Sequence, residues 1–234
     1  MIEIKNVSKS FGKKIVLQNV NVKLEGNQIV GLLGQNGSGK TTLLKIIAGL
    51  IQDFKGEILI DGKALGPKMK EKINYLPAES FLEKEWDIRT MIDFHHDMFP
   101  GFDRVKAREI MERFGLDDRQ KIKTMSTGIQ EKLETALVMS RKSPIYLLDE
   151  PLGGIDVSIR RKILENIIRN YAEGSLMVIS THLIGEVETI IDRAVIIKDQ
   201  TIYSNRLVED IREREGKNLE DYFVEIFEEE DYVF

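Results

Sequence analysis

The sequence predicts an α/β fold in which a parallel sheet is preceded by an antiparallel β portion and interrupted by a helical insert. Residues 29–33 are continuously apolar, as expected of a parallel strand covered on both faces, and they lead into a glycine-rich loop and a predicted helix over 41–50. Two further apolar runs, at 145–148 and 176–180, are separated by a segment in which isoleucines recur at helical spacing. Strands that alternate with helices in this way indicate a parallel sheet.

The beginning and the middle of the chain differ from this pattern. Residues 2–7 and 20–24 alternate apolar and polar side chains, which is typical of antiparallel strands with one face in water. The segment at about 83–141 has a mostly helical pattern, so we expect it to form a helical subdomain inserted into the α/β domain. The predicted helices of this insert are 89–98, 103–114 and 128–141.

The end of the chain, at about 205–234, is predicted to be a C-terminal tail helix. It is strongly charged over 209–217 and then places Leu219, Phe223 and Ile226 on one helical face. We expect this helix to dock on the domain, and a separate binding peptide is the alternative.

Size, charge and composition limit the possible functions. With 234 residues and 42% hydrophobic content, the chain can bury a substantial core, and we expect a single domain over 1–234. The formal net charge of −5 offers no broad electrostatic footprint for nucleic acid, so no nucleic-acid partner is expected. The absence of cysteine excludes disulfides and thiolate metal sites. No secretory pattern and no apolar run near the roughly 20 residues of a membrane span is found, so a cytoplasmic location is expected.

A phosphate-binding loop is the strongest functional signal. Residues 34–41 read Gly-Gln-Asn-Gly-Ser-Gly-Lys-Thr, which fits G-x-x-x-x-G-K-[ST] between a strand and a helix, as that motif requires. Glycines allow successive backbone N–H groups to turn toward a phosphate, and the helix N-terminus adds partial positive charge. We expect Lys40 to reach the β- and γ-phosphates of ATP, Thr41 to ligate Mg²⁺, and Thr42 to bond near the α-phosphate. The predicted ATP-binding residues of this phosphate loop are Gly34, Asn36, Gly37, Ser38, Gly39, Lys40, Thr41 and Thr42.

Two carboxylates end a buried strand. Residues 145–148 lead directly into Asp149 and Glu150. Burial of such charges is costly unless they meet a cation or hydrogen-bond donors, so both carboxylates need a partner. Asp149 suits the ligand shell of Mg²⁺, and Glu150 suits polarisation of the water that attacks the γ-phosphate. Neutral carboxylates at the strand end, bound to nearby backbone amides, are the alternative.

A third motif lies shortly before this acidic strand, where residues 125–130 read Met-Ser-Thr-Gly-Ile-Gln. Together with the phosphate loop and the acidic strand, in this order and over essentially the full length, it resembles the nucleotide-binding subunit of ATP-binding-cassette (ABC) transporters. The resemblance implies the ABC ATPase fold, a P-loop NTPase fold, with Ser126, Thr127 and Gly128 in place of the family signature L-S-G-G-Q. It also implies a head-to-tail dimer, in which these residues contact the ATP held by the other cassette. Backbone amides and a hydroxyl at a helix start do form an anion site, and an ordinary N-cap by Ser126 or Thr127 is a compatible alternative.

Single residues extend the resemblance. Phe11 resembles the aromatic residue that stacks on adenine, and His182 resembles the switch histidine that contacts the γ-phosphate, so that Glu150 and His182 would be catalytic. Asp156 resembles the acidic member of the loop that couples the two ATP sites. By contrast, His95 and His96 are predicted to be a solvated pair on a surface helix rather than a metal site.

The sequence departs from the family pattern at three places. Thr127 carries a β-branch where glycine is common, and Ile129 removes a polar group. Ala78 stands where the family often has glutamine and cannot ligate Mg²⁺, so any such role passes to Glu79 or is absent. The coupling loop has Gly153–Gly154 in place of the usual Ser or Thr followed by Ala or Gly.

These features together predict an ATP-hydrolysing ABC transporter subunit that resembles bacterial exporter-type (ABC-2-like) cassettes. Its partners would be ATP with Mg²⁺, a second cassette in a homodimer or heterodimer, and a separate transmembrane permease that holds it at the inner face of the cell membrane. The runner-up is a soluble ABC ATPase that acts in translation or on DNA, although the chain has one phosphate loop and no long heptad run. A non-catalytic, ATP-gated interaction module is a third hypothesis, because of Ala78 and Ile129.

Overall fold

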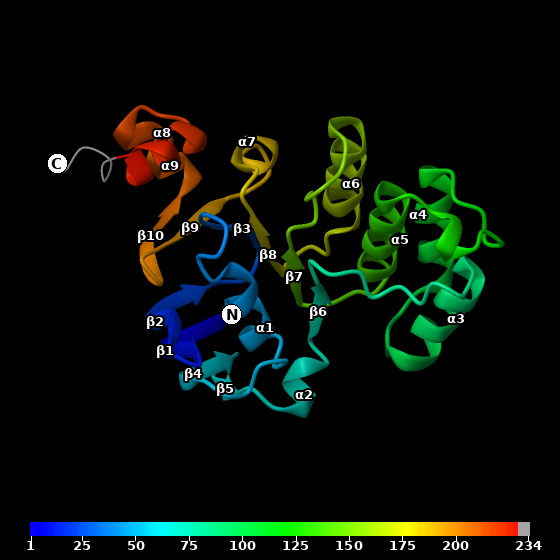
Figure 1. Cartoon of the computed structure of the whole chain (residues 1–234), viewed down its shortest axis with the longest axis horizontal. Helices are drawn as coiled ribbons and strands as arrows, with labels where there is room; N and C mark the ends of the chain where they lie inside the picture. The colour runs from blue at the N-terminus through cyan, green and yellow to red at the C-terminus, as the bar shows by residue number, and fades with distance from the viewer. Residues whose placement is uncertain (229–234) are drawn as a thin grey trace.

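A six-stranded sheet, parallel except at one edge, forms the centre of the molecule (Figure 1). The computed structural model describes residues 1–228 of the chain. The strand order is β10-β9-β3-β8-β7-β6, in which β9 and β10 pair antiparallel and the other neighbours pair parallel. The strands are β3 (Gln28–Leu33), β6 (Ile73–Leu76), β7 (Ile145–Asp149), β8 (Leu176–Thr181), β9 (Arg193–Lys198) and β10 (Thr201–Leu207).

A second, antiparallel sheet contains the N-terminal strands, in the order β2-β1-β4-β5. Its strands are β1 (Ile2–Phe11), β2 (Lys14–Leu24), β4 (Lys55–Ile60) and β5 (Lys63–Ala64). The predicted antiparallel β portion is therefore confirmed, and it is extended by a hairpin that follows the first helix, α1 (Lys40–Ile47).

The parallel sheet is buried on both faces, which explains why its strands are continuously apolar. In β3, Val30 and Leu32 pack in one core with α1 and the antiparallel sheet, whereas Ile29 and Leu33 pack in a second core with the helices. This follows from the strand repeat, because successive side chains point to opposite faces. The predicted α/β fold class is confirmed.

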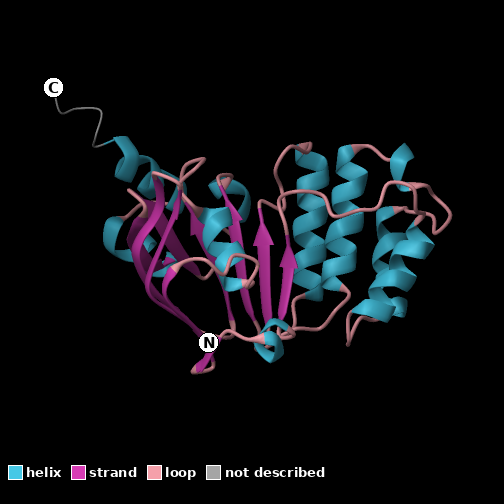
Figure 2. Ribbon diagram, turned by 60° about the horizontal axis from the view of Figure 1, so that its bottom comes forward, coloured by secondary structure: helices cyan, strands magenta, loops and turns pink. Residues whose placement is uncertain are grey.

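The helical insert lies at one end of the molecule, beside β6 (Figures 1 and 2). Its elements are α3 (Ile88–Met98), α4 (Arg104–Phe114), the short 3₁₀ helix η1 (Ile122–Thr124) and α5 (Thr127–Met139). Local sequence sets the boundaries: the Asp87 carboxylate accepts the Thr90 N–H at the start of α3, and the Asp103 carboxylate accepts two N–H groups at the start of α4. The remaining helices of the domain are α2 (Pro67–Lys70), α6 (Val157–Asn170) and α7 (Ile184–Val187).

The C-terminal segment contains two helices, so the prediction of one tail helix over 205–234 is wrong. Residues 205–207 still belong to β10, and α8 (Val208–Glu215) is separated from α9 (Leu219–Glu228). The break falls at Gly216, whose φ of +66° is the left-handed conformation in which helices commonly end. Residues 229–234 of the predicted helix lie outside the described residues.

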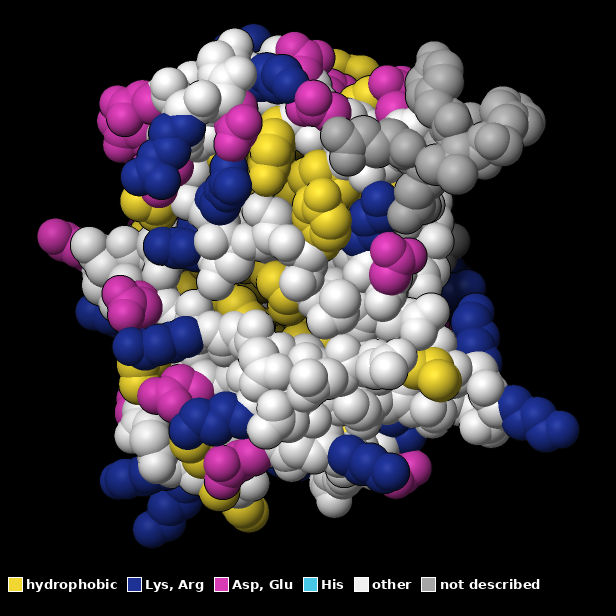
Figure 3. All heavy atoms as spheres, turned by 90° about the vertical axis from the view of Figure 1, so that its left-hand side faces the viewer, with side chains coloured by type: hydrophobic (Ala, Val, Ile, Leu, Met, Phe, Trp, Pro, Cys, Tyr) yellow, Lys and Arg dark blue, Asp and Glu magenta, His cyan; other side chains and the backbone are white. Residues whose placement is uncertain are grey.

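The second of these helices docks on the domain, as expected. Leu219 and Ile226 are buried in the core, and Phe223 packs against it. Figure 3 shows this side of the molecule, where apolar side chains gather among charged ones. The large apolar side chains exposed in β10 and α9 are Tyr203, Leu207 and Val224. Within residues 1–228, no helix combines the length and apolar character needed to cross a bilayer.

Candidate nucleotide site

The strand order brings three predicted motifs to one edge of the parallel sheet. β8 lies between β3 and β7, with Leu33 opposite Thr181 and Asp149 opposite Ser180. The carboxyl ends of parallel strands meet at the same edge, which is where α/β sheets bind ligands. The phosphate loop after β3, the acidic pair at the end of β7 and the histidine after β8 are therefore neighbours.

The phosphate loop is held in shape by Lys40 and by close packing. Lys40 is 5% exposed, and its Nζ donates to the carbonyl oxygens of Gly34 (2.9 Å) and Gln35 (3.3 Å). Gly39 has a φ of +105°, and a Cβ there would come within 2.8 Å of Leu17 Cδ2 and 3.0 Å of Val16 O. A side chain at position 39 would therefore push the loop away from β2.

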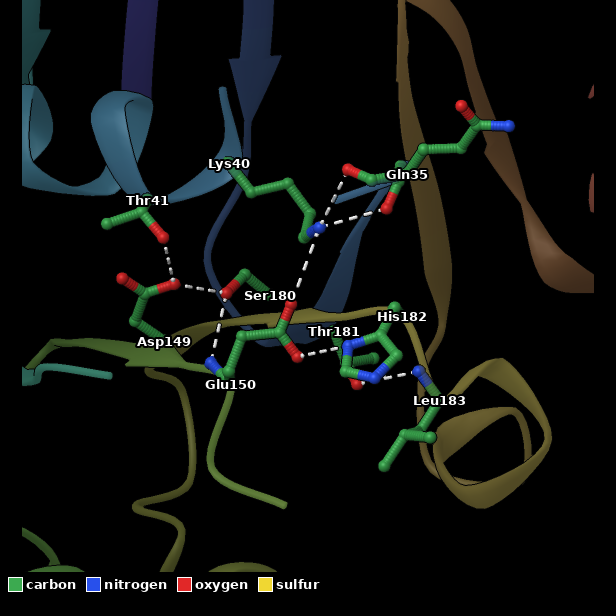
Figure 4. Close-up of polar contacts among 10 residues, drawn as sticks. Gln35, Lys40, Thr41, Asp149, Glu150, Ser180, Thr181, His182 and Leu183 are labelled. Atoms are coloured by element: carbon green, nitrogen blue, oxygen red, sulfur yellow. Dashed lines mark hydrogen bonds and ion pairs between the residues drawn. The ribbon is translucent and has the colours of Figure 1, made fainter. Parts of the chain in front are cut away.

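A cavity of about 270 Å³ lies over this loop. Its lining residues are Asn36, Gly37, Gly39, Lys40, Thr41, Thr42, Glu150 and His182. The structure thus brings most of the predicted ATP-binding loop together with both predicted catalytic residues, as Figure 4 shows for the charged groups. Gly34 and Ser38 do not line this cavity, and a Cβ on Gly34 would meet Ser38 Oγ at 2.5 Å.

Glu150 contacts Lys40 and His182 on two sides of the cavity. Its Oε1 lies 3.4 Å from Lys40 Nζ, and its Oε2 lies 2.9 Å from His182 Nδ1 (Figure 4). The backbone of Glu150 is left-handed, with a φ of +49°, which is uncommon for a residue other than glycine. Glu150 is therefore directed at the phosphate loop although the neighbouring Asp149 has other partners.

Asp149 is almost fully buried and accepts hydrogen bonds from three hydroxyl groups. Thr41 Oγ1 (3.1 Å) and Ser180 Oγ (2.6 Å) donate to its Oδ1, and Tyr75 Oη (3.3 Å) donates to its Oδ2. Burial, and secondarily the charge of Asp149, raise the pKa of Tyr75, so its phenol remains a donor. The alternative in which the carboxylates bind only backbone amides is wrong for Asp149.

Sequence reasoning missed Ser180 and Tyr75. Ser180 opens the Ser-Thr-His run that ends at His182, and Tyr75 stands two residues before Pro77. Both residues lie close to motifs that the sequence analysis singled out. Their hydrogen bonds to Asp149, however, form only because β6 and β8 lie on either side of β7.

The oxygen donors of Thr41 and Asp149 fit Mg²⁺, which binds through one or two protein oxygens together with phosphates and waters. Among the described residues, no group of three or more His, Cys, Asp or Glu side chains is arranged to hold a metal ion. Thr41 and Asp149 are instead an incomplete oxygen set of the kind that nucleotide phosphates complete. Glu79, to which a role in Mg²⁺ binding could pass from Ala78, is exposed on the loop after β6. The nearby side chain that contacts Asp149 is Tyr75, through its hydroxyl.

Comparison with known proteins decides the family. A family model described as ABC transporter matches residues 17–153. The ABC transporter ATP-binding protein YtrB of Bacillus subtilis (strain 168) is 31% identical over 216 residues, which cover 91% of this chain and 74% of that protein. The chain belongs to the ABC transporter family.

Two further relatives match this chain over nearly all of their own lengths. The lantibiotic transport ATP-binding protein SrtF of Streptococcus pyogenes is 29% identical over 95% of this chain and 96% of SrtF. The dimeric structure of the bacterial ABC transporter cassette MJ0796 superposes with a TM-score of 0.77 at 26% identity, over 88% of this chain and 98% of that one. The chain is thus an ATP-binding subunit of an ABC transporter.

The signature residues of this ABC cassette lie apart from its nucleotide cavity. Ser126 and Thr127 are exposed at the start of α5, and none of the three signature residues lines the cavity over the phosphate loop. Ser126 occupies the N-cap position, but its hydroxyl makes no capping hydrogen bond. The N-cap alternative is therefore wrong for the side chain of Ser126, whose hydroxyl stays available to a ligand.

Two more predicted positions also lie outside the cavity. Phe11 is 51% exposed at the end of β1, with its ring centroid 4.8 Å from Lys9 Nζ. Asp156 is exposed at the N-cap position of α6 and makes no side-chain capping bond. Both groups face solvent, where a nucleotide base or a second cassette can reach them.

His95 of this cassette is buried, so the predicted solvated pair is wrong for that residue. It follows Met91 by one helical turn on the buried face of α3, and its Nδ1 lies 2.9 Å from the Met91 carbonyl oxygen. Burial lowers the pKa of His95. Its ring packs against Phe81, Phe94, Phe99 and Phe102. His95 is part of the aromatic packing of the helical insert.

Proposed function

We propose that this ABC cassette hydrolyses MgATP in a head-to-tail dimer and that closure of the dimer drives a separate membrane permease in a bacterial exporter. The observation that carries the proposal is the position of Glu150. Its carboxylate lies between Lys40 Nζ and His182 Nδ1, in the cavity over the phosphate loop. This is where the γ-phosphate of a nucleotide on the loop would meet an attacking water.

The proposed step begins when ATP takes Lys40 away from Glu150. The β- and γ-phosphates are stronger anionic partners for the Lys40 ammonium, so Glu150 is released to accept a proton from water. His182 stays beside the Glu150 carboxylate and orients it toward the γ-phosphate. Mg²⁺, held by Thr41 and Asp149, would supply charge neutralisation at the β- and γ-phosphates.

The second half of the site would come from another cassette. Ser126 presents an unbonded hydroxyl at the exposed N-terminus of α5, where free backbone N–H groups favour an anion. The cassette MJ0796 is dimeric in its solved structure. We therefore propose that Ser126, Thr127 and Gly128 contact the terminal phosphate of the ATP on the mate, with Asp156 at the same interface.

A groove of about 660 Å³ offers a docking place for the permease. Leu50, three residues after α1, lines it on the side of the α/β core, and Trp86, Phe94 and Phe99 line it on the side of the helical insert. Phe81, from the loop at 77–82, lies in the same wall. An apolar helical segment of a permease that filled this groove would contact both parts of the cassette and transmit their relative motion. It would hold the chain at the inner face of the membrane.

The export role has support from SrtF, which shares nearly the full length of this chain and is named as a lantibiotic transport ATP-binding protein. We extend the export role, and not the cargo, to this chain. The non-catalytic hypothesis is disfavoured by the placement of Glu150 against Lys40 and His182. No specific observation favours the runner-up in translation or on DNA.

Substitution of Glu150 tests the catalytic part of the proposal. Glu150→Gln should lower ATP turnover at least about 100-fold and retain ATP binding, because a general base contributes about that factor. Lys40→Ala should weaken ATP binding itself. Glu173→Gln, an exposed glutamate in the loop before β8, is the matched control and should leave both unchanged. Undiminished turnover in Glu150→Gln would remove Glu150 from the catalytic role.

Copurification from gently solubilised membranes tests the transport part. A polytopic membrane protein should accompany the chain, and Phe94→Glu in the groove should abolish this association while ATP binding remains. Ile168→Glu is the control, since Ile168 is 45% exposed on α6 and does not line the groove. Recovery of ribosomal material in place of a membrane protein would favour the runner-up.

A further inference from the structure

The hydroxyl of Ser180 contacts both acidic residues of the nucleotide site. Ser180 lies at the carboxyl end of β8 and is fully buried. Its Oγ donates to Asp149 Oδ1 at 2.6 Å and accepts the N–H of Glu150 at 3.1 Å, while its carbonyl oxygen accepts the same N–H at 3.0 Å. One small side chain thus joins the carboxylate of Asp149 to the backbone of Glu150 (Figure 4).

A second hydroxyl holds the other oxygen of Asp149. Tyr75 is half-buried in β6, whose residues pair with β7, and its Oη lies 3.3 Å from Asp149 Oδ2. Three residues further on, Ala78 has no polar group with which to reach this region. The hydrogen bond that β6 supplies to Asp149 therefore comes from Tyr75.

These contacts leave Asp149 little freedom. A carboxylate can accept about four hydrogen bonds, and Thr41, Ser180 and Tyr75 supply three of them. The left-handed φ of Glu150 is a strained conformation that persists only where neighbouring groups hold it, and the double contact of its N–H with Ser180 does so.

We propose that Ser180 and Tyr75 are positioning residues, which fix the metal-binding carboxylate of Asp149 and, through Ser180, its angle to the carboxylate of Glu150. The inference rests on the proposed function and adds to it. Neither residue lines the cavity over the phosphate loop, so Tyr75 acts through Asp149, and Ser180 acts through Asp149 and Glu150.

Two substitutions remove these hydroxyls, and two others are matched controls. Ser180→Ala and Tyr75→Phe each delete one oxygen beside Asp149. Ser140→Ala deletes a hydroxyl that is equally buried but bonded to the Ala136 carbonyl, and Tyr146→Phe deletes a buried phenol bonded to Ser143 N and Arg141 O. A purely structural loss should affect the controls as much as the test variants.

The experiment measures ATP affinity with Mg²⁺ and with EDTA, and takes the ratio of the two dissociation constants for each variant. Ser180→Ala and Tyr75→Phe should each reduce the gain in ATP affinity from Mg²⁺ about 5-fold, which is the factor that corresponds to one lost hydrogen bond. The ATP affinity in EDTA should stay within about 2-fold of the wild-type value. Both controls should keep the wild-type ratio. In turnover, Ser180→Ala should lower kcat about 10-fold with little change in KM, because Glu150 is also displaced.

The outcomes separate the inference from the proposed function. A Mg²⁺ ratio in both test variants equal to that of the controls would overturn the positioning role. Tyr75→Phe decides the matter if Ser180→Ala does not fold. Failure of the wild-type chain to bind ATP under either condition would overturn the proposed function itself.

Discussion

The carboxyl edge of the parallel sheet and the N-terminus of α5, the two proposed halves of the ATP site, differ in how their polar groups are paired. At the sheet edge, Asp149 is 1% exposed with three hydroxyl donors, and Lys40 and His182 both contact Glu150. At the start of α5, Ser126 is exposed and makes no capping bond. One half is therefore internally satisfied, whereas the other half has donors without acceptors.

This difference teaches which part of the site a single chain can assemble. Buried charges must be paired within the chain that buries them, so the carboxylates at the sheet edge are held before any ligand arrives. Exposed N–H and hydroxyl groups are hydrogen-bonded to water and need no partner within the chain, so they can later bind a phosphate held by another chain. The arrangement suits a site that is completed by a second cassette.

The largest expected effect comes from a negative charge at the exposed half. Ser126→Glu should lower ATP turnover about 100-fold, as expected when a donor to the terminal phosphate is lost, and leave ATP affinity of the single chain within about 2-fold. Val105→Glu, which adds the same charge to the exposed first turn of α4, is the control. Steady-state turnover and equilibrium ATP binding are the measurements.

Mixing two inactive variants sharpens this test. A dimer of one Ser126→Glu chain and one Lys40→Ala chain has one site with an intact phosphate loop and an intact signature from opposite chains. Turnover should therefore recover on mixing. Absence of recovery, together with weakened ATP binding by Ser126→Glu alone, would show that the signature serves the ATP of its own chain.

An intermediate effect distinguishes glycines required by the fold from the glycine of the signature. A Cβ on Gly56 would lie 2.5 Å from the carbonyl oxygens of Lys5 and Asn6, at a φ of +97°, so Gly56→Ala should lower the free energy of unfolding by about 1–3 kcal/mol. The one close contact of a Cβ on Gly128 would be the movable tip of Ile159, at 2.7 Å. Gly128→Ala should therefore change the free energy of unfolding by less than about 1 kcal/mol. Urea unfolding measures both, and equal losses would contradict the distinction.

The smallest expected effect concerns the body of α5, behind the exposed signature. Glu131 Oε2 is buried without a partner, and burial, followed by the charge of Glu134, raises the pKa of Glu131 to about 7. Because the pKa is raised above the ordinary value of 4.5 for a glutamate, the neutral form stabilises the folded state at low pH, and this stability is lost as pH rises through about 7. Glu131→Gln should therefore raise Tm by about 2–4 °C at pH 8.

The dependence of Tm on pH distinguishes an effect of ionisation from an effect of packing. At pH 4 the same substitution should leave Tm nearly unchanged, because wild-type Glu131 is then neutral. Glu109→Gln, at an exposed position on α4, is the control. An equal gain in Tm at both pH values would assign the change to packing and not to ionisation.

The sequence by itself determined the features that depend on local pattern. The apolar runs at 29–33, 145–148 and 176–180 specify buried parallel strands, because a sheet covered on both faces needs apolar side chains at every position. The phosphate loop and the helix that follows it can likewise be predicted from the sequence, because loop geometry and capping depend on only a few neighbouring residues. The roles of Lys40 and Glu150 were predicted on this basis, and the structure places the two side chains together.

Only the tertiary structure decided the contacts between segments that are distant in the chain. The bonds of Ser180 and Tyr75 to Asp149 exist because β8 and β6 flank β7, and strand order depends on the packing of the whole sheet. The burial of His95 depends on the rings of Phe81, Phe99 and Phe102, which lie outside α3, whereas its neighbour His96 stays exposed. Such contacts are set by burial and shape across the chain, and no local spacing encodes them.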